Sequence, residues 1–145
     1  MTTIRMARNY DAPALAALCG ELGYPATRQQ LVARLAAIGA QASDRVFVAE
    51  DGGGTVVGWL HVALRGGLLD DEVAEIHGLV VTDAARGNGI GAALLQAAET
   101  WARERGATGL RVRSRVERER AHHFYERAGY ARRKSQHVFA KPLGG

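Results

Sequence analysis

The chain is poor in cysteine and has no long apolar run. Its single cysteine, Cys19, excludes a disulfide framework and any metal cluster built from cysteines. No apolar run approaches the ~18 residues that a membrane-spanning helix needs. The first residues are interrupted by Arg5, Arg8, Asp11 and Pro13 and do not have the pattern of a signal peptide. These absences predict a soluble, cytoplasmic protein with no membrane partner and no metal.

The composition is that of an ordinary globular protein, with 47% hydrophobic and 23% charged residues. A length of 145 residues without repeats or linkers predicts a single domain over residues 1–145. The formal net charge of +4 conceals a split. Residues 1–100 carry seven basic and eleven acidic side chains, whereas residues 101–145 carry twelve basic and four acidic ones. A basic half indicates an anionic ligand or a nucleic acid, and an acidic half indicates a cation.

Hydrophobic periodicity predicts one mixed α/β (α+β) domain with the element order β-α-α-β-β-β-α-β-α-β. The expected strands cover residues 3–7, 46–49, 55–64, 73–81 and 109–116, with one or two more within 130–141. The expected helices run from Asp11 to Gly23, from Thr27 to Gly39, from the turn before Ile90 through Trp101, and from Glu117 to Ala128. Asp11 is expected to cap the first helix, and Thr27 with Gln30 has the form of a capping box at the second.

A glycine-rich segment, Arg86-Gly87-Asn88-Gly89-Ile90-Gly91, separates the apolar strand 73–81 from the third helix. Alternate glycines let the backbone approach a ligand, and a helix N-terminus presents unpaired amides to an anion such as a phosphate. A tight turn alone would need one glycine. The segment lacks the Lys-Ser/Thr ending of a P-loop, and too little sequence follows it for a dinucleotide-binding domain.

The spacing Arg86-x-x-Gly89-x-Gly91 resembles the pyrophosphate-binding motif of the GCN5-related N-acetyltransferases, the GNAT superfamily. Residues 75–81 resemble that family's fourth strand, and residues 121–130, Ala-His-His-Phe-Tyr-Glu-Arg-Ala-Gly-Tyr, resemble its final motif. The likeness extends to small bacterial members, including aminoglycoside N-acetyltransferase-like proteins. It implies a single GNAT-like domain whose mixed, mostly antiparallel sheet is splayed between strands 4 and 5 and flanked by helices.

The resemblance further implies acetyl-coenzyme A (acetyl-CoA) as acetyl donor and no metal. Strand 4 would hold the pantetheine arm, the glycine-rich loop the pyrophosphate, and the final helix the far side of the cofactor. Carried over residue by residue, the cofactor-binding set is Leu79, Val80, Val81, Arg86, Gly87, Asn88, Gly89, Ile90, Gly91, Ala92, Ser114, Ala121, Phe124 and Tyr125. Arg115 and Arg118 stand where related sequences often carry asparagine, and they serve the 3′-phosphate or are merely solvated.

Acetyl transfer to an amine needs two proton movements. An alkylamine with a pKa of ~10.4 must lose a proton, which costs about 4–5 kcal/mol near pH 7. Glu75 matches the position of the base in the histone-modifying branch of the family, with His77 on the same strand face and water as alternatives. Tyr125 fits a general acid that protonates the departing thiolate, and a backbone N–H near Val80 fits an oxyanion donor.

The acceptor is expected to be a small cationic amine, with an aminoglycoside as the first candidate and direct transfer in a ternary complex. The family's acceptor loops correspond here to residues 20–26 and 65–72. The substrate-binding candidates are Glu21, Tyr24, Asp70, Asp71, Glu72 and His77. A polyamine, an amino acid or a protein amine remains an alternative, and a homodimer is possible for the family.

Two other functions are alternatives to acetyl transfer. Alternate arginines between Arg103 and Lys134 suit a nucleic-acid-binding module, but few aromatic residues lie among them and the glycine-rich loop would go unexplained. We therefore expect no nucleic-acid partner. A catalytically silent acyl-CoA sensor would keep the cofactor site without turnover.

Overall fold

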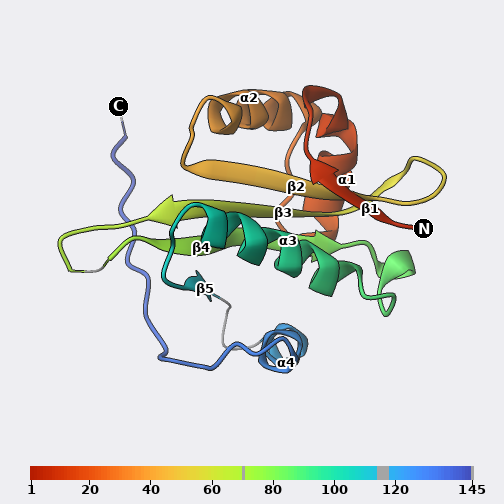
Figure 1. Ribbon diagram of the computed structural model, residues 1–145. Coiled ribbons are helices and arrows are strands. Elements are labelled where there is room, and N and C mark those ends of the chain that lie inside the picture. Colours follow the sequence, from red (N-terminus) through yellow and green to blue (C-terminus); the bar gives the residue numbers. More distant parts are fainter. Residues whose placement is uncertain (70, 114–117, 145) are drawn as a thin grey trace. The chain divides into compact units, whose positions relative to one another are not determined.

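The computed structural model of the chain describes residues 1–69, 71–113 and 118–144 (Figure 1). It divides into two compact units, residues 1–113 and residues 114–145, and each is treated by itself below. The expectation of a single domain over 1–145 stays a prediction. In the described residues, no helix is long and apolar enough to cross a membrane.

The first unit is built on a five-stranded sheet whose spatial order follows the chain. The strands are β1 (Thr3–Met6), β2 (Asp44–Glu50), β3 (Val56–Arg65), β4 (Val73–Val81) and β5 (Leu110–Val112). The first four strands pair antiparallel, and β5 pairs parallel with β4. The predicted mixed, mostly antiparallel sheet is therefore confirmed.

Helices cover both faces of this sheet (Figure 1). They are α1 (Ala12–Leu22), α2 (Arg28–Gly39) and α3 (Ile90–Glu104), with short 3₁₀ turns η1 (Asn9–Asp11) and η2 (Asp83–Ala85). Val48 and Trp59 are cross-strand partners on one face, and both pack with Leu15 of α1 and Leu31 of α2. The next pair along the ladder contains Gly58, which faces the Leu94 side chain of α3 on the opposite side.

One of the two predicted helix caps forms. Thr27 Oγ1 accepts from the Gln30 N–H at 3.0 Å, and Gln30 Oε1 accepts from the Thr27 N–H at 2.9 Å. The expected cap by Asp11 is wrong. Its carboxylate turns back to accept from the Arg8 N–H at 2.8 Å and from the Arg5 guanidinium, because the 3₁₀ turn η1 already precedes α1.

A β-bulge interrupts β4. Cross-strand pairing runs His61 to Gly78 and Val62 to Ile76, so His77 is an extra residue on β4. A bulge bends its strand and re-aims side chains. In the described residues β5 pairs with β4 only from Ala74 to Ile76, so the following residues of β4 have no strand on that side. The splay that the resemblance implied would begin after this last pair, Ile76 with Val112, and it stays a prediction because residues 114–117 lie outside the described chain.

Gly78 follows the bulge and supports the ring of Trp59. A Cβ atom at this glycine would lie 2.6 Å from Cη2 and 2.8 Å from Cζ3 of the indole. No side-chain atom fits there unless the ring moves, so the tryptophan and β4 are packed directly against each other.

The second unit contains α4 (Glu119–Arg127). Gly129, two residues after this helix, has the left-handed conformation with a φ of 96°. The strands expected within residues 130–141 are absent from the described chain. Residues 132–136 are all polar and cannot offer an apolar strand face. Val138 and Phe139, the large apolar residues that follow, are 89% and 93% exposed and gain no burial.

Candidate active site

The glycine-rich loop connects β4 to α3 through η2. Gly87 and Gly89 have φ values of 87° and 75°, a region that side chains other than glycine rarely adopt. A Cβ atom at either position would meet nothing within 4 Å. The backbone conformation therefore demands these glycines, and the space beside them is free for a ligand. This loop fits a phosphate group.

The first turn of α3 leaves its amides available. No side chain of the described residues caps this helix at Gly89. The Ala93 N–H donates to the Gly89 carbonyl at 3.0 Å, so it begins the intrahelical ladder, and the amides before it have no carbonyl four residues back within the helix. Unpaired amides and the positive end of the helix dipole together favour an anion at this end.

Two polar side chains brace the loop from within. Arg86 Nε donates to the Val81 carbonyl at 3.1 Å, and Arg86 Nη1 forms an ion pair with Asp83. Asn88 Nδ2 donates to the Ala85 carbonyl at 3.2 Å. The guanidinium of Arg86 thus lies at the loop, as expected, but in this structure its contacts are to the protein itself.

The open side of β4 lies directly before this loop. Leu79, Val80 and Val81 follow the last pair between β4 and β5. An unpaired strand edge presents N–H and C=O groups in alternation, which suits an extended, amide-containing ligand. The pantetheine arm of acetyl-CoA is such a ligand, so the three residues named for it are placed suitably.

Glu75 lies on β4 with 7% of its surface exposed and is held by two arginines of the β5 segment. Its Oε2 accepts from Nε and Nη2 of Arg111, each at 3.2 Å. Its Oε1 lies 3.3 Å from Nη1 of Arg113. Both carboxylate oxygens of the predicted base are therefore engaged by guanidinium groups.

His77 projects from the bulge and its ring stacks on that of His61, with centroids 5.0 Å apart and planes inclined by 29°. Asp44 lies behind His61, with its Oδ2 2.8 Å from His61 Nε2. Burial lowers the pKa of His77, and the charges of His61 and Arg65 lower it further. This histidine is consequently a neutral imidazole near pH 7 and can accept a proton.

The acceptor candidates are not gathered in one place. The Glu21 carboxylate accepts from the Thr82 hydroxyl at 2.9 Å and from the Asp83 N–H at 3.1 Å, which lowers its pKa. It therefore lies at the start of the cofactor loop. Asp71 and Glu72 are exposed in the connection before β4. Tyr24 is 50% exposed after α1. Asp70 lies outside the described residues.

The second unit carries the remaining candidates. Tyr125 of α4 contacts Phe124 and Tyr130 edge-on, with ring centroids 5.1 and 5.9 Å away. Burial raises the pKa of Tyr125 to about 12, against the opposing effect of the Arg118 charge. The phenol is thus protonated and able to donate at any physiological pH. Ala121 lies one turn earlier in the same helix. Ser114 and Arg115 are outside the described residues.

Residues 12–130 match the family model described as Acetyltransferase (GNAT) family, which covers most of the chain. The chain belongs to the GNAT family of acetyltransferases. The predicted family, fold class and enzyme class are confirmed. The roles of the individual site residues stay predictions.

This GNAT chain is similar to aminoglycoside N(6')-acetyltransferase type 1 of Stenotrophomonas maltophilia, with 33% identity over 145 residues, or 97% of this chain and 94% of the relative. Its fold is that of the aminoglycoside antibiotic 6'-N-acetyltransferase AAC(6')-Ih from Acinetobacter baumannii, with a TM-score of 0.85, 20% identity, and 99% and 100% coverage of the two chains. It is also that of AAC(6')-Iy in complex with the bisubstrate analog CoA-S-monomethyl-acetylneamine, with a TM-score of 0.88, 16% identity and 99% coverage of both chains.

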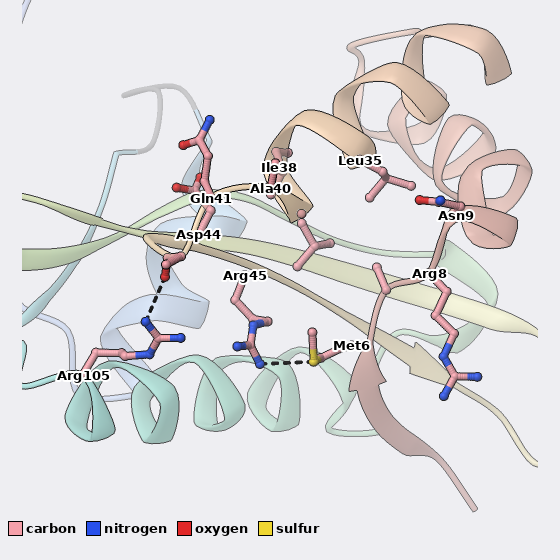
Figure 2. A pocket seen from close by; sticks show the side chains of 14 residues that line it. Met6, Arg8, Asn9, Leu35, Ile38, Ala40, Gln41, Asp44, Arg45 and Arg105 are labelled. Atoms are coloured by element: carbon pink, nitrogen blue, oxygen red, sulfur yellow. Dashed lines mark hydrogen bonds between the residues drawn. The ribbon is translucent and has the colours of Figure 1, made fainter.

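A cavity of about 420 Å³ lies elsewhere on the GNAT fold (Figure 2). Arg105, which directly follows α3, lines it, whereas the glycine-rich loop lies at the other end of this helix. Arg105 Nη1 donates to the Ala42 carbonyl at 2.9 Å, and Arg45 Nη1 lies 3.2 Å from Met6 Sδ. None of the predicted site residues lines this cavity.

Sequence reasoning missed Asp44 and His61. Their contact spans 17 residues and depends on the β2–β3 register, in which Asp44 pairs with Ala63 and Val46 with His61. Side chains along a strand alternate between the two faces of the sheet, and this rule would assign a face to His61 and to His77. The extra residue at His77 changes that alternation. No local sequence pattern predicts the bulge.

Proposed function

We propose that this GNAT chain transfers the acetyl group of acetyl-CoA to a primary amine of a small cationic molecule, with an aminoglycoside as the first class to test. The observation that carries the proposal is the open loop at Gly87 and Gly89. Within the described residues, this loop joins a strand whose last residues have no neighbour on one side to a helix N-terminus without a side-chain cap. The family match and the CoA-analog complex of a protein with the same fold support acetyl-CoA as donor.

The chain's own groups divide the binding of the donor between them. Amides at the start of α3 hold the pyrophosphate. The β4 segment from Leu79 to Val81, which has no neighbouring strand on the β5 side among the described residues, holds the pantetheine arm. Acetyl-CoA supplies the acetyl group as a thioester. A backbone N–H near Val80 donates to the thioester oxygen and stabilises the charge that develops there.

Proton transfer accounts for the polar groups on β4 and α4. The acceptor amine gives up its proton to Glu75, to His77 or to water. Tyr125, whose pKa of about 12 keeps its phenol protonated, donates to the departing sulfur. The amine attacks within a complex that holds both substrates, so no acetylated side chain is needed.

A cationic acceptor is supported by charge and by a relative. The first hundred residues carry four more acidic than basic side chains, and Asp71 and Glu72 are exposed just before β4. The relative from Stenotrophomonas maltophilia, 33% identical, is named as an aminoglycoside N(6')-acetyltransferase. Acetylation of a protein, peptide or amino-acid amine is the alternative.

The deciding experiment follows thiol release from acetyl-CoA across a panel of amines. The panel contains aminoglycosides with and without a 6'-amine, linear polyamines, free amino acids and peptides with free amino termini. We expect release with the 6'-amino compounds, and mass spectrometry of the product to show one added acetyl group. Turnover confined to peptides would replace the proposed acceptor. Tight CoA binding without any turnover would favour the sensor.

A further inference from the structure

His77 lies at the β-bulge of β4. It is the extra residue of the bulge, exposed, and only two residues before Leu79, where the unpaired edge proposed for the pantetheine arm begins. Its side chain therefore belongs to the part of β4 that directly precedes the residues proposed to bind the donor. Bulges commonly re-aim a side chain next to an active site.

His61 is fixed by a buried carboxylate. The side chain of Asp44 is 4% exposed, and its Oδ2 lies 2.8 Å from His61 Nε2. Ser43 Oγ donates to Asp44 Oδ1 at 2.7 Å, and Arg65 Nη1 lies 3.5 Å from the same oxygen. Burial raises the pKa of Asp44, but these donors outweigh it and the pKa falls below its usual value. An ionised Asp44 requires that His61 carry its proton on Nε2.

The stacked His61 ring covers one face of His77. Two protonated rings with centroids 5.0 Å apart repel each other, so charge on the Asp44-bound ring disfavours charge on His77. The charge of Arg65 also lowers the pKa of His77, whereas the charges of Glu75 and Asp44 raise it. Arg111 of β5 and Arg113, which directly follows this strand, offset the charge of Glu75.

Glu75 is less suited to accept a proton. Both of its oxygens face guanidinium groups, at 3.2 Å for Arg111 and 3.3 Å for Arg113. Whichever oxygen received a proton would already be in contact with a guanidinium group, and the side chain belongs to a residue that is only 7% exposed. His77 has no ion pair among the described residues, so accepting a proton breaks none.

We propose that His77 is the catalytic base for the acceptor amine, and that His61, anchored by Asp44, is the positioning residue that holds the His77 ring ready to accept a proton. This inference rests on the proposed acetyl transfer. The ammonium gives one proton to a His77 ring nitrogen. The freed lone pair forms the C–N bond as the C–S bond breaks. Tyr125 gives its proton to the sulfur and takes up the second nitrogen proton in its place, and His77 later releases its proton to water.

The test uses His61→Gln, because a glutamine amide still donates to Asp44 but cannot take a charge. We expect NMR titration of the enzyme without substrates to show the pKa of His77 raised by about half a unit or more, the size of one unit charge at 5 Å in a watery surrounding. The acidic limb of the kcat/KM profile for a cationic amine should move by the same amount. His77→Gln should lower kcat by about a hundredfold and abolish that limb.

The control is His137→Gln, an exposed residue of the C-terminal segment, which should change neither the titration of His77 nor the rate profile. An unchanged His77 pKa in folded His61→Gln overturns the role of His61. A shifted pKa with an unshifted acidic limb overturns His77 as the base. Should the wild type acetylate no amine at all, the proposed function fails, while the NMR titration still decides whether His61 governs His77.

Discussion

The buried acidic side chains of the described residues are Asp11, Asp44 and Glu75, and each is met by an arginine. A carboxylate is buried at acceptable cost only when such donors replace its water. Arg5 is doubly used, because it binds Asp11 with two nitrogens at 2.9 Å and Glu50 with Nε at 2.8 Å. Each of these ion pairs links two different elements of the fold.

We expect Asp11→Asn to lower the free energy of unfolding by about 3 kcal/mol near neutral pH, because it leaves Arg5 short of a partner in a buried place. Burial raises the pKa of Asp11, but Arg5 and the Arg8 N–H lower it more, to below the ordinary value of 3.8. The stabilisation is therefore complete above that value and is lost as the pH falls through the lower pKa of the folded state. Urea unfolding at several pH values should show the two proteins converging below about pH 4. A constant difference down to pH 2 would contradict this account.

Tyr125→Phe should lower kcat by about a hundredfold with little change in CoA affinity, because it removes only a donated proton. The ring contacts with Phe124 and Tyr130 need no hydroxyl and should persist. Steady-state kinetics with calorimetric CoA binding makes the measurement. Tyr10→Phe, which changes an exposed phenol in the first unit, is the control and should match the wild type. Wild-type turnover in folded Tyr125→Phe would remove this residue from the mechanism.

At the scale of elements, the α3 N-terminus and the loop before it act as one binding device. We expect Gly89→Val to abolish the rise in melting temperature that CoA causes, because the side chain is strained at a φ of 75° and the turn must change. Gly106→Val is a matched control, since Gly106 has a φ of 80°, has equal free space and follows the far end of the same helix.

Both glycine variants should lose some stability because of backbone strain. Their melting temperatures are therefore measured first without CoA. Only Gly89→Val should then lose its response to CoA. An equal loss in both variants would mean that the effect is general destabilisation, and an equal response in both would mean that the loop does not hold the pyrophosphate.

Elements with strong local patterns could be predicted from the sequence. The apolar run of β4 gave the correct limits, Val73 and Val81, and the Thr27–Gln30 capping box formed as expected. The missed features depend on distant partners. The bulge at His77 arises from the pairing with β3, and the expected strands after Tyr130 are absent from the described residues. Residues 132–136 are all polar and offer no apolar face that could pack as a strand.

The same distinction holds for the candidate site. The glycine loop was evident because Gly87 and Gly89 lie close together in sequence and their conformation is a local property. The sequence predicts that Glu21 binds the acceptor. Its contacts with Thr82 and Asp83, about sixty residues away in the chain, could not be predicted from the sequence. Its role in acceptor binding stays a prediction.

At the scale of the whole molecule, the uneven charge bears on the acceptor. We expect Asp71→Asn with Glu72→Gln to raise KM for a polycationic amine by about threefold at low salt, because two exposed attractive charges are lost. The kcat should change less, since neither group is placed at the reacting atoms. The salt dependence of KM should also flatten, since screening acts over ~8 Å at physiological ionic strength.

A double variant with the same charge change, Glu104→Gln with Glu119→Gln, separates local from overall charge. Glu104 ends α3 and Glu119 begins α4, and both are exposed. This control should leave KM near the wild-type value. Equal effects of the two double variants would assign the attraction to net charge alone, and no effect of the first would exclude its two acids from acceptor binding.

The contact between Trp59 and Gly78 gives this protein a built-in optical reporter. The chain has two tryptophans, and the indole nitrogens of both are buried without a hydrogen-bond partner in the described residues. Such rings emit at short wavelength. Trp59 touches β4 directly beside the edge assigned to the donor, whereas Trp101 lies in α3. Replacing Trp101 with phenylalanine would leave a single tryptophan, packed against β4, and we expect its emission to change when acetyl-CoA binds there.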